Sequence, residues 1–111
     1  MKVAVVGGRN FNNYSLLKET LDAYKITEII SGGARGADTL AEKYSEENDI
    51  DLTVYYPDWG KFGRAAGPII NKDIIKNADF VVAFWDGYSR GTKSSIQLSK
   101  EYNKQIKVIY Y

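Results

Sequence analysis

The ten residues "SGGARGADTL" (31–40) join two segments of different character and decide the fold. The segment before the joint, "TEIIS" (27–31), is short, β-branched and apolar, as a buried strand is. The segment after it has the apolar spacing of an amphipathic helix, carried by Ala37, Leu40, Ala41 and Tyr44. Three glycines, one arginine and one aspartate crowd this joint, which is more than a plain turn requires.

Strand-like and helix-like segments alternate along the rest of the chain. The other predicted strands are 2–7, 51–56, 80–85 and 106–111. Three further helices are predicted. One carries the apolar residues Leu17, Leu21 and Tyr24, and one begins at Gly67-Pro68 and carries Ile70, Ile74, Ile75 and Ala78. The last has a weaker apolar stripe over 92–104. The alternation predicts one domain over 1–111, an α/β three-layer sandwich that is Rossmann-like around a five-stranded, mainly parallel sheet. Segments 2–7 and 80–85 are the most continuously apolar, which predicts that they are central and that the order is 3-2-1-4-5.

The composition limits the chemistry that the chain can perform. The 111 residues include no histidine and no cysteine, which excludes a Ser-His-Asp triad, a thiol nucleophile and a thiolate or imidazole zinc site. Any acid or base must be Asp, Glu, Lys or Tyr. A net charge of +1 argues against tight nonspecific binding of nucleic acid. Without a long apolar run, a signal peptide or cysteine, we expect a cytoplasmic protein with no membrane partner.

Glycines and arginines are distributed unevenly. All ten glycines follow a predicted strand, and every arginine is adjacent to a glycine, in Gly8-Arg9, Arg35-Gly36, Gly63-Arg64 and Arg90-Gly91. In a parallel sheet these joints share one edge, where open α/β sheets bind ligands. Glycine lets the backbone approach an anion, and arginine recognises phosphate with a planar fork. The pattern predicts an anion pocket for a phosphate-bearing ligand.

Several of these residues also have a structural explanation. The glycines could serve turn sterics alone, and Asp38 could complement the dipole of its helix, orient Arg35 or accept a ribose hydroxyl. The stretch "YYPDWGKFGR" (55–64) could be a packed surface loop, or its Trp59 and Phe62 could stack on a base. Asp86 directly follows a predicted strand, where it could read a ribose hydroxyl or an amino group.

The segments "GGR-F", "GGARGAD", "DW-----GRAAGPI-N" and "D-----GT" together resemble the SLOG superfamily. This Rossmann-like group includes the DNA-processing protein DprA and the LOG phosphoribohydrolases, and the sequence is most similar to its small stand-alone YspA-like branch. The resemblance covers nearly the whole chain and implies a pocket for nucleotides or nucleotide-derived ligands. The implied pocket residues are Gly8, Arg9, Gly32, Gly33, Arg35, Gly36, Asp38, Arg64, Gly67, Asn71, Asp86, Gly91 and Thr92, to which the glycine-arginine pairs add Arg90.

One departure from the LOG pattern concerns catalysis. LOG enzymes carry a Pro-Gly-Gly-x-Gly-Thr-x-x-Glu signature whose glutamate takes part in releasing the base. The corresponding stretch here is "YSRGTKSS" (88–95), in which Gly91-Thr92 remain but Ser95 stands at the glutamate position. We therefore expect no LOG catalytic residue and no phosphoribohydrolase activity.

Three functions remain open. The favoured one is binding of a nucleotide or nucleotide derivative by a sensor, sequestering protein or carrier, with no cofactor and no metal. The second is an enzyme that cleaves a nucleotide with Asp38 or Asp86, and the third is a DprA-like binder of single-stranded DNA. The sequence leaves open a homo-oligomer, and its richness in Asn, Lys, Ile and Tyr is typical of an AT-rich bacterial or phage genome.

Overall fold

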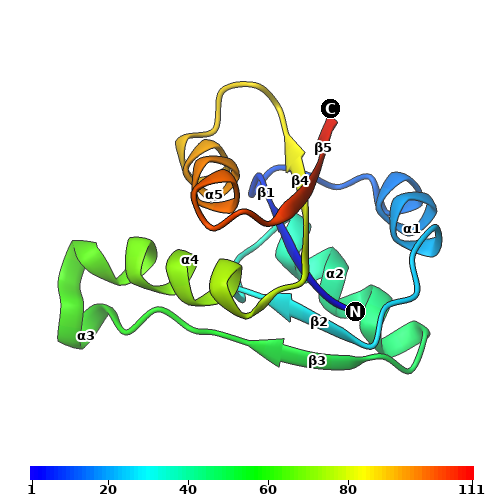
Figure 1. The fold of residues 1–111 in the computed structure, drawn as a ribbon, viewed down its shortest axis with the longest axis horizontal. Coiled ribbons are helices and arrows are strands. Elements are labelled where there is room, and N and C mark those ends of the chain that lie inside the picture. Colours follow the sequence, from blue (N-terminus) through cyan, green and yellow to red (C-terminus); the bar gives the residue numbers. More distant parts are fainter.

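A computed structural model describes residues 1–111 and confirms the predicted α/β architecture (Figure 1). Five parallel strands pair in the predicted order β3-β2-β1-β4-β5. The strands are β1 (Lys2–Gly7), β2 (Glu28–Ser31), β3 (Asp51–Val54), β4 (Phe80–Trp85) and β5 (Gln105–Tyr110). The helices are α1 (Tyr14–Asp22), α2 (Ala37–Glu47), α3 (Trp59–Phe62), α4 (Ala66–Asn77) and α5 (Arg90–Glu101), with a 3-10 turn η1 (Gly63–Ala65).

The core consists of two apolar clusters, one on each face of the sheet. On one face Leu17 and Leu21 of α1 and Ala41 of α2 pack with residues of β1, β2 and β4. On the other face Ile75 of α4 and Ile96 of α5 pack with the alternate residues of the same strands. The central strands β1 and β4 are therefore covered on both faces, as their continuous apolar sequences predicted.

Segment 55–66 is more ordered than a surface loop. After β3 ends at Val54, Asp58 accepts the N–H of Lys61 at 3.0 Å and starts α3, and η1 leads directly into α4. Helix α4 thus begins at Ala66 rather than at Gly67-Pro68, and Pro68 lies in its first turn, where a missing N–H breaks no helical bond. The helix predicted over 92–104 spans Arg90–Glu101 instead.

No helix of the structure is long and apolar enough to cross a bilayer.

Candidate functional site

A cavity of about 730 Å³, called here the main cavity, opens at the carboxyl ends of β1 and β4. This is the position at which the strand order reverses, because β1 is followed in the sheet by β2 on one side and by β4 on the other. Its lining residues are Val6–Asn10, at the end of β1 and just after it; Gly32, Ala34 and Asp38; Pro57 and Trp59; Gly67, Pro68, Ile70, Asn71 and Ile74; and Ser89–Thr92, Ser94 and Ser95.

The β1–α1 loop is clamped between α2 and the end of β5. The carbonyl oxygen of Gly8 accepts the N–H groups of Ala37 at 3.2 Å and of Phe11 at 3.3 Å. The hydroxyl of Tyr111 lies against Gly8, where any Cβ would overlap it, and donates to Asn10 Oδ1 at 2.7 Å. These contacts fix the backbone that carries Arg9.

Gly36 is required by packing as well as by backbone conformation. Its φ is +77°, and an added Cβ would overlap the carbonyl oxygen of Gly8 and lie 2.7 Å from the carbonyl carbon of Arg9. Gly33, with φ of +70°, would place a Cβ 2.7 Å from the ring of Tyr56. Both glycines thus have a structural reason that does not involve approach to a ligand.

The first turn of α5 lines the main cavity and contains free hydrogen-bond donors. Asp86 Oδ1 accepts the N–H groups of Tyr88 and Ser89, both at 2.8 Å, and these bonds hold the pKa of Asp86 below its usual value. The first helical bond runs from the Lys93 N–H to the Ser89 carbonyl at 3.1 Å. The backbone N–H groups of Arg90, Gly91 and Thr92 therefore have no acceptor within the protein.

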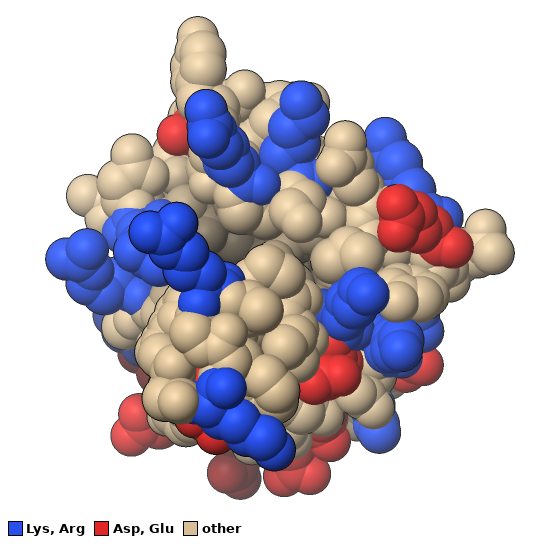
Figure 2. All heavy atoms as spheres, turned by 90° about the vertical axis from the view of Figure 1, so that its left-hand side faces the viewer, with Lys and Arg blue, Asp and Glu red and all other residues tan.

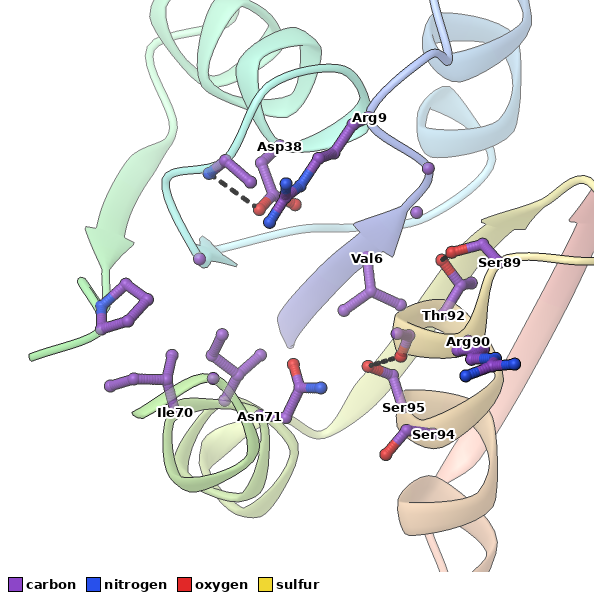
Figure 3. Close-up of a pocket in the computed structure, with 18 of the residues that line it drawn as sticks. Val6, Arg9, Asp38, Ile70, Asn71, Ser89, Arg90, Thr92, Ser94 and Ser95 are labelled. Atoms are coloured by element: carbon purple, nitrogen blue, oxygen red, sulfur yellow. Dashed lines mark hydrogen bonds between the residues drawn. The ribbon is translucent and has the colours of Figure 1, made fainter. Parts of the chain in front are cut away.

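Asp38 is the only acidic residue that lines the main cavity, and its pKa is raised. Its Oδ2 accepts the Ala34 N–H at 3.1 Å, and Figure 3 shows the side chain of Arg9 reaching toward it. Burial raises the pKa of Asp38 to about 6, because this effect outweighs the hydrogen bond from Ala34 and the attraction of Arg9. Asp38 neighbours Arg9, whereas orientation of Arg35 was one of the alternatives that the sequence left open.

The main cavity has a polar side and an apolar side. Arg9, Thr92 and the α5 donors form the polar side, and the hydroxyl groups of Ser89 and Thr92 lie 3.3 Å apart (Figure 3). The apolar side is formed by Pro57, Trp59, Pro68, Ile70 and Ile74. Trp59 is 55% exposed, so much of its indole surface is open to a ligand.

A smaller hollow, called here the second hollow, lies beside the main cavity and has a volume of about 350 Å³. Its lining residues are Arg9, Asn10, Phe11, Asn12, Arg35, Gly36, Thr39 and Leu40. Arg9 and Asn10 line both spaces. Figure 2 views the molecule from the side toward which β2 and β3 point in Figure 1. Lys and Arg side chains surround a hollow on this face, and most of the acidic side chains in view lie along its lower margin.

The structure brings together most of the residues expected at the site. The expected residues that line the main cavity are Gly8, Arg9, Gly32, Asp38, Gly67, Asn71, Arg90, Gly91 and Thr92. Arg35 and Gly36 line the second hollow, and Gly33, Arg64 and Asp86 line neither space. The four arginines therefore do not converge on one cavity, and Arg90 extends away from the other labelled side chains (Figure 3).

Several lining residues were missed by sequence reasoning. Asn10, Ser89 and Ser94 carry polar side chains but belong to no glycine-arginine pair and no acidic group. The turn "YSRGTKSS" contained a signal, because its hydroxyl side chains recur where a helix was predicted to start. Ser95 is 2% exposed and donates to the Gly91 carbonyl at 3.2 Å. No group of three potential metal-ligating side chains occurs.

Residues 1–62 match the model of the family described as YAcAr, the YspA, cpYpsA-related SLOG family. The chain belongs to this SLOG family. The matched part runs from β1 to α3 and includes Arg9 and Asp38, whereas the SLOG protein's α4 and α5 lie outside it. The main cavity is thus lined both by residues of the matched part of the SLOG chain and by residues beyond it.

Two known proteins are similar to this SLOG chain. The gene 61 protein of Mycobacterium phage D29 is 32% identical over 71 residues, which are 59% of this chain and 57% of that protein. The chain thus spans little more than half the length of this relative. The solved structure of DNA processing protein A from Helicobacter pylori, described as binding single-stranded DNA, matches 97% of this chain and 64% of its own. Its TM-score is 0.67 at 24% identity, so this likeness supports the fold alone.

Proposed function

We propose that this SLOG protein binds a nucleotide or nucleotide-derived ligand in the main cavity, as a sensor, sequestering protein or carrier. The observation that carries this proposal is the set of three free N–H groups in the first turn of α5, whose residues line the same cavity as Arg9. Such donors match the acceptor oxygens of a phosphate. The cavity volume of about 730 Å³ lies within the usual range for small-molecule sites, about 300–1,000 Å³.

The two sides of the main cavity match the two ends of a nucleotide. A phosphate fits the side formed by Arg9, Gly91 and Thr92, since Gly91 has no side chain and no atom within 4 Å of an added Cβ. A base fits the apolar side, where Trp59 offers a stacking surface. Asn71 lies between these sides in Figure 3, and its amide can both donate to and accept from a base or a ribose.

Replacing Trp59 tests the orientation of the ligand. Trp59→Ala is expected to weaken AMP binding about 10-fold, because base stacking on an aromatic side chain contributes roughly 1–3 kcal/mol. Binding of ribose 5-phosphate, which has no base, is expected to stay unchanged. Calorimetry would measure both, with Tyr88→Ala as the control, since Tyr88 is 88% exposed and lines neither space.

The proposal itself depends on finding a bound ligand. We expect native mass spectrometry of freshly purified protein to show a nucleotide-like mass, and calorimetry with AMP, GMP, CMP and UMP to detect binding of at least one. If no nucleotide co-purifies and none of the four binds, the proposed function is wrong.

A second candidate is nucleotide cleavage, which Asp38 favours. A carboxyl group that lines the main cavity with a pKa of about 6 can exchange protons near neutral pH. Asp86 is less suited, because its Oδ1 accepts two backbone N–H groups and it lines neither space. Ser95 lies at the expected glutamate position but cannot carry the negative charge that stabilises an oxocarbenium-like state.

We expect no release of free base from nucleoside monophosphates. The physical reason is the missing second carboxylate, since Asp38 alone would have to serve both the leaving base and the attacking water. Chromatography of AMP incubated with the protein would measure adenine directly. Adenine that accumulates with the wild type and not with Asp38→Asn would establish the cleavage function instead.

A third candidate is binding of single-stranded DNA. The exposed aromatic residues Tyr56, Trp59 and Phe62 lie in one stretch with Lys61 and Arg64, a combination that suits stacked bases and their phosphates. DNA binding through several phosphates would weaken steeply with added salt, whereas binding of one mononucleotide would not.

A further inference from the structure

The second hollow presents hydrogen-bond donors and positive charge: Asp38 attracts Arg9 from the main cavity, but Arg35 has no acidic partner. None of its lining residues is acidic, and neither Arg9 nor Arg35 forms an ion pair, since the structure's only ion pair joins Lys18 and Asp22. Asn10 uses its carbonyl oxygen to accept the Tyr111 hydroxyl at 2.7 Å, so its amide NH₂ remains as a donor. A ligand for this hollow must therefore supply acceptors and negative charge, as a phosphate does.

The β1–α1 loop, which separates the main cavity from the second hollow, is held in place by contacts with Phe84, Tyr111 and Ala37. The ring of Phe11 stacks on Phe84 with centroids 4.6 Å apart and meets the edge of Tyr111 at 4.8 Å. The carbonyl oxygen of Gly8 is hydrogen-bonded to Ala37. Because Arg9 and Asn10 belong to this anchored loop and line both spaces, the main cavity and the second hollow keep a constant separation.

We propose that the second hollow is a phosphate subsite of the same ligand site. The ligand then carries two phosphates, one on the α5 side of the main cavity and one beside Arg35, with Arg9 between them. This inference rests on the proposed function and specifies its ligand as a dinucleotide rather than a mononucleotide. The group recognised is a pair of nucleotides joined by a phosphodiester bond. Such a pair occurs as a free dinucleotide or within an oligonucleotide.

The test compares AMP with the dinucleotide pApA, which adds a second nucleoside and a bridging phosphate. Wild-type protein is expected to bind pApA at least about 10-fold more tightly than AMP, because the second phosphate adds a charge-assisted contact. Arg35→Gln is expected to remove most of this difference while changing AMP affinity less than about 2-fold. Arg35→Lys is expected to fall between the two, since it keeps the charge and loses the fork.

Two controls separate a local contact from general effects. Lys43→Gln removes one positive charge from α2, the helix that follows Arg35, but Lys43 lines neither space, so it is expected to leave both affinities unchanged. Thermal unfolding of each variant checks the fold, and Arg35 is exposed, so its replacement is expected to leave the midpoint in place.

Each outcome is informative. If AMP binds but pApA binds no more tightly, or if Arg35→Gln weakens both equally, the second subsite is wrong and the proposed function stands. If neither compound nor any other nucleotide binds, the proposed function fails as well. Adding pA₅ identifies the source of the ligand: affinity equal to that of pApA supports a free dinucleotide, and a further steep, salt-dependent gain supports an oligonucleotide.

Discussion

Gly36→Val is expected to lower the free energy of unfolding by about 3–5 kcal/mol, enough to unfold a marginally stable domain. Two effects add. A β-branched residue is strained at a φ of +77°, and its Cβ would overlap the Gly8 carbonyl oxygen, which already accepts the Ala37 N–H. The side chain would push the β1–α1 loop away from α2. Urea unfolding followed by circular dichroism would measure the loss.

Gly91→Ala is the matched control for this prediction. Gly91 also follows a strand and lines the main cavity, but its φ is not in the left-handed region and an added Cβ meets no atom within 4 Å. In the first turn of α5, alanine is expected to change stability by no more than about 1 kcal/mol, and in the favourable direction. Equal effects of the two substitutions would show that the loop is not held as described.

Asp38→Asn is expected to make the protein more stable at pH 8, by about 3 kcal/mol. Burial raises the pKa of Asp38 from 3.8 to about 6, and each unit corresponds to about 1.4 kcal/mol between the protonation states. The folded state therefore holds this proton more tightly than the unfolded state, and the contribution of Asp38 to stability falls as pH rises from about 4 to about 6. Asparagine can still accept the Ala34 N–H and carries no charge.

The measurement is urea unfolding of both proteins between pH 4 and pH 8. The difference in free energy of unfolding is expected to be small at pH 4 and to reach its full size above pH 7. Asp86→Asn provides a control of opposite sign: the pKa of Asp86 is lowered by the Tyr88 and Ser89 N–H groups, so this variant should lose stability at pH 8. A constant difference across the pH range would contradict the raised pKa of Asp38.

Because ionised Asp38 lowers the stability of the fold and lines the main cavity, we expect it to contact any ligand that binds there. Asparagine would satisfy Ala34 equally well, so the hydrogen bond alone does not explain the carboxylate. A ligand hydroxyl, such as that of a ribose, would be accepted by ionised Asp38, whereas a phosphate placed beside it would be repelled. Arg9 lies next to Asp38 (Figure 3), so a phosphate bound by this guanidinium would have to lie on the side away from the carboxylate.

The fold could be predicted from sequence because its signals are local and repeated. Each strand is a short apolar run, and the continuous runs of β1 and β4 marked the two strands that are covered on both faces. The boundaries were less accurate where side chains settle them. Asp58 starts α3 through a single capping bond at 3.0 Å, and nothing in the apolar pattern distinguishes that turn from a loop.

The site was harder to predict because adjacency in sequence does not give direction in space. Arg9 and Arg35 flank the same contact between the β1–α1 loop and α2, yet only Arg9 lines the main cavity. Whether an arginine after a strand lies inside or outside a cavity depends on how the loops pack. Here the Gly8 contacts with Gly36 and Tyr111 settle that packing, and residues separated so widely in sequence carry no local signal.

The strand order also has a consequence for synthesis of the protein on the ribosome. Strand β1 leaves first, but Val3 pairs with Phe80 of β4, so one edge of β1 stays unpaired until most of the chain has emerged. An unpaired apolar strand is prone to wrong pairing and aggregation during that interval. The α5 wall of the main cavity emerges later still. A ligand of the main cavity would therefore stabilise only chains whose synthesis has passed α5, and would leave the nascent first half unprotected.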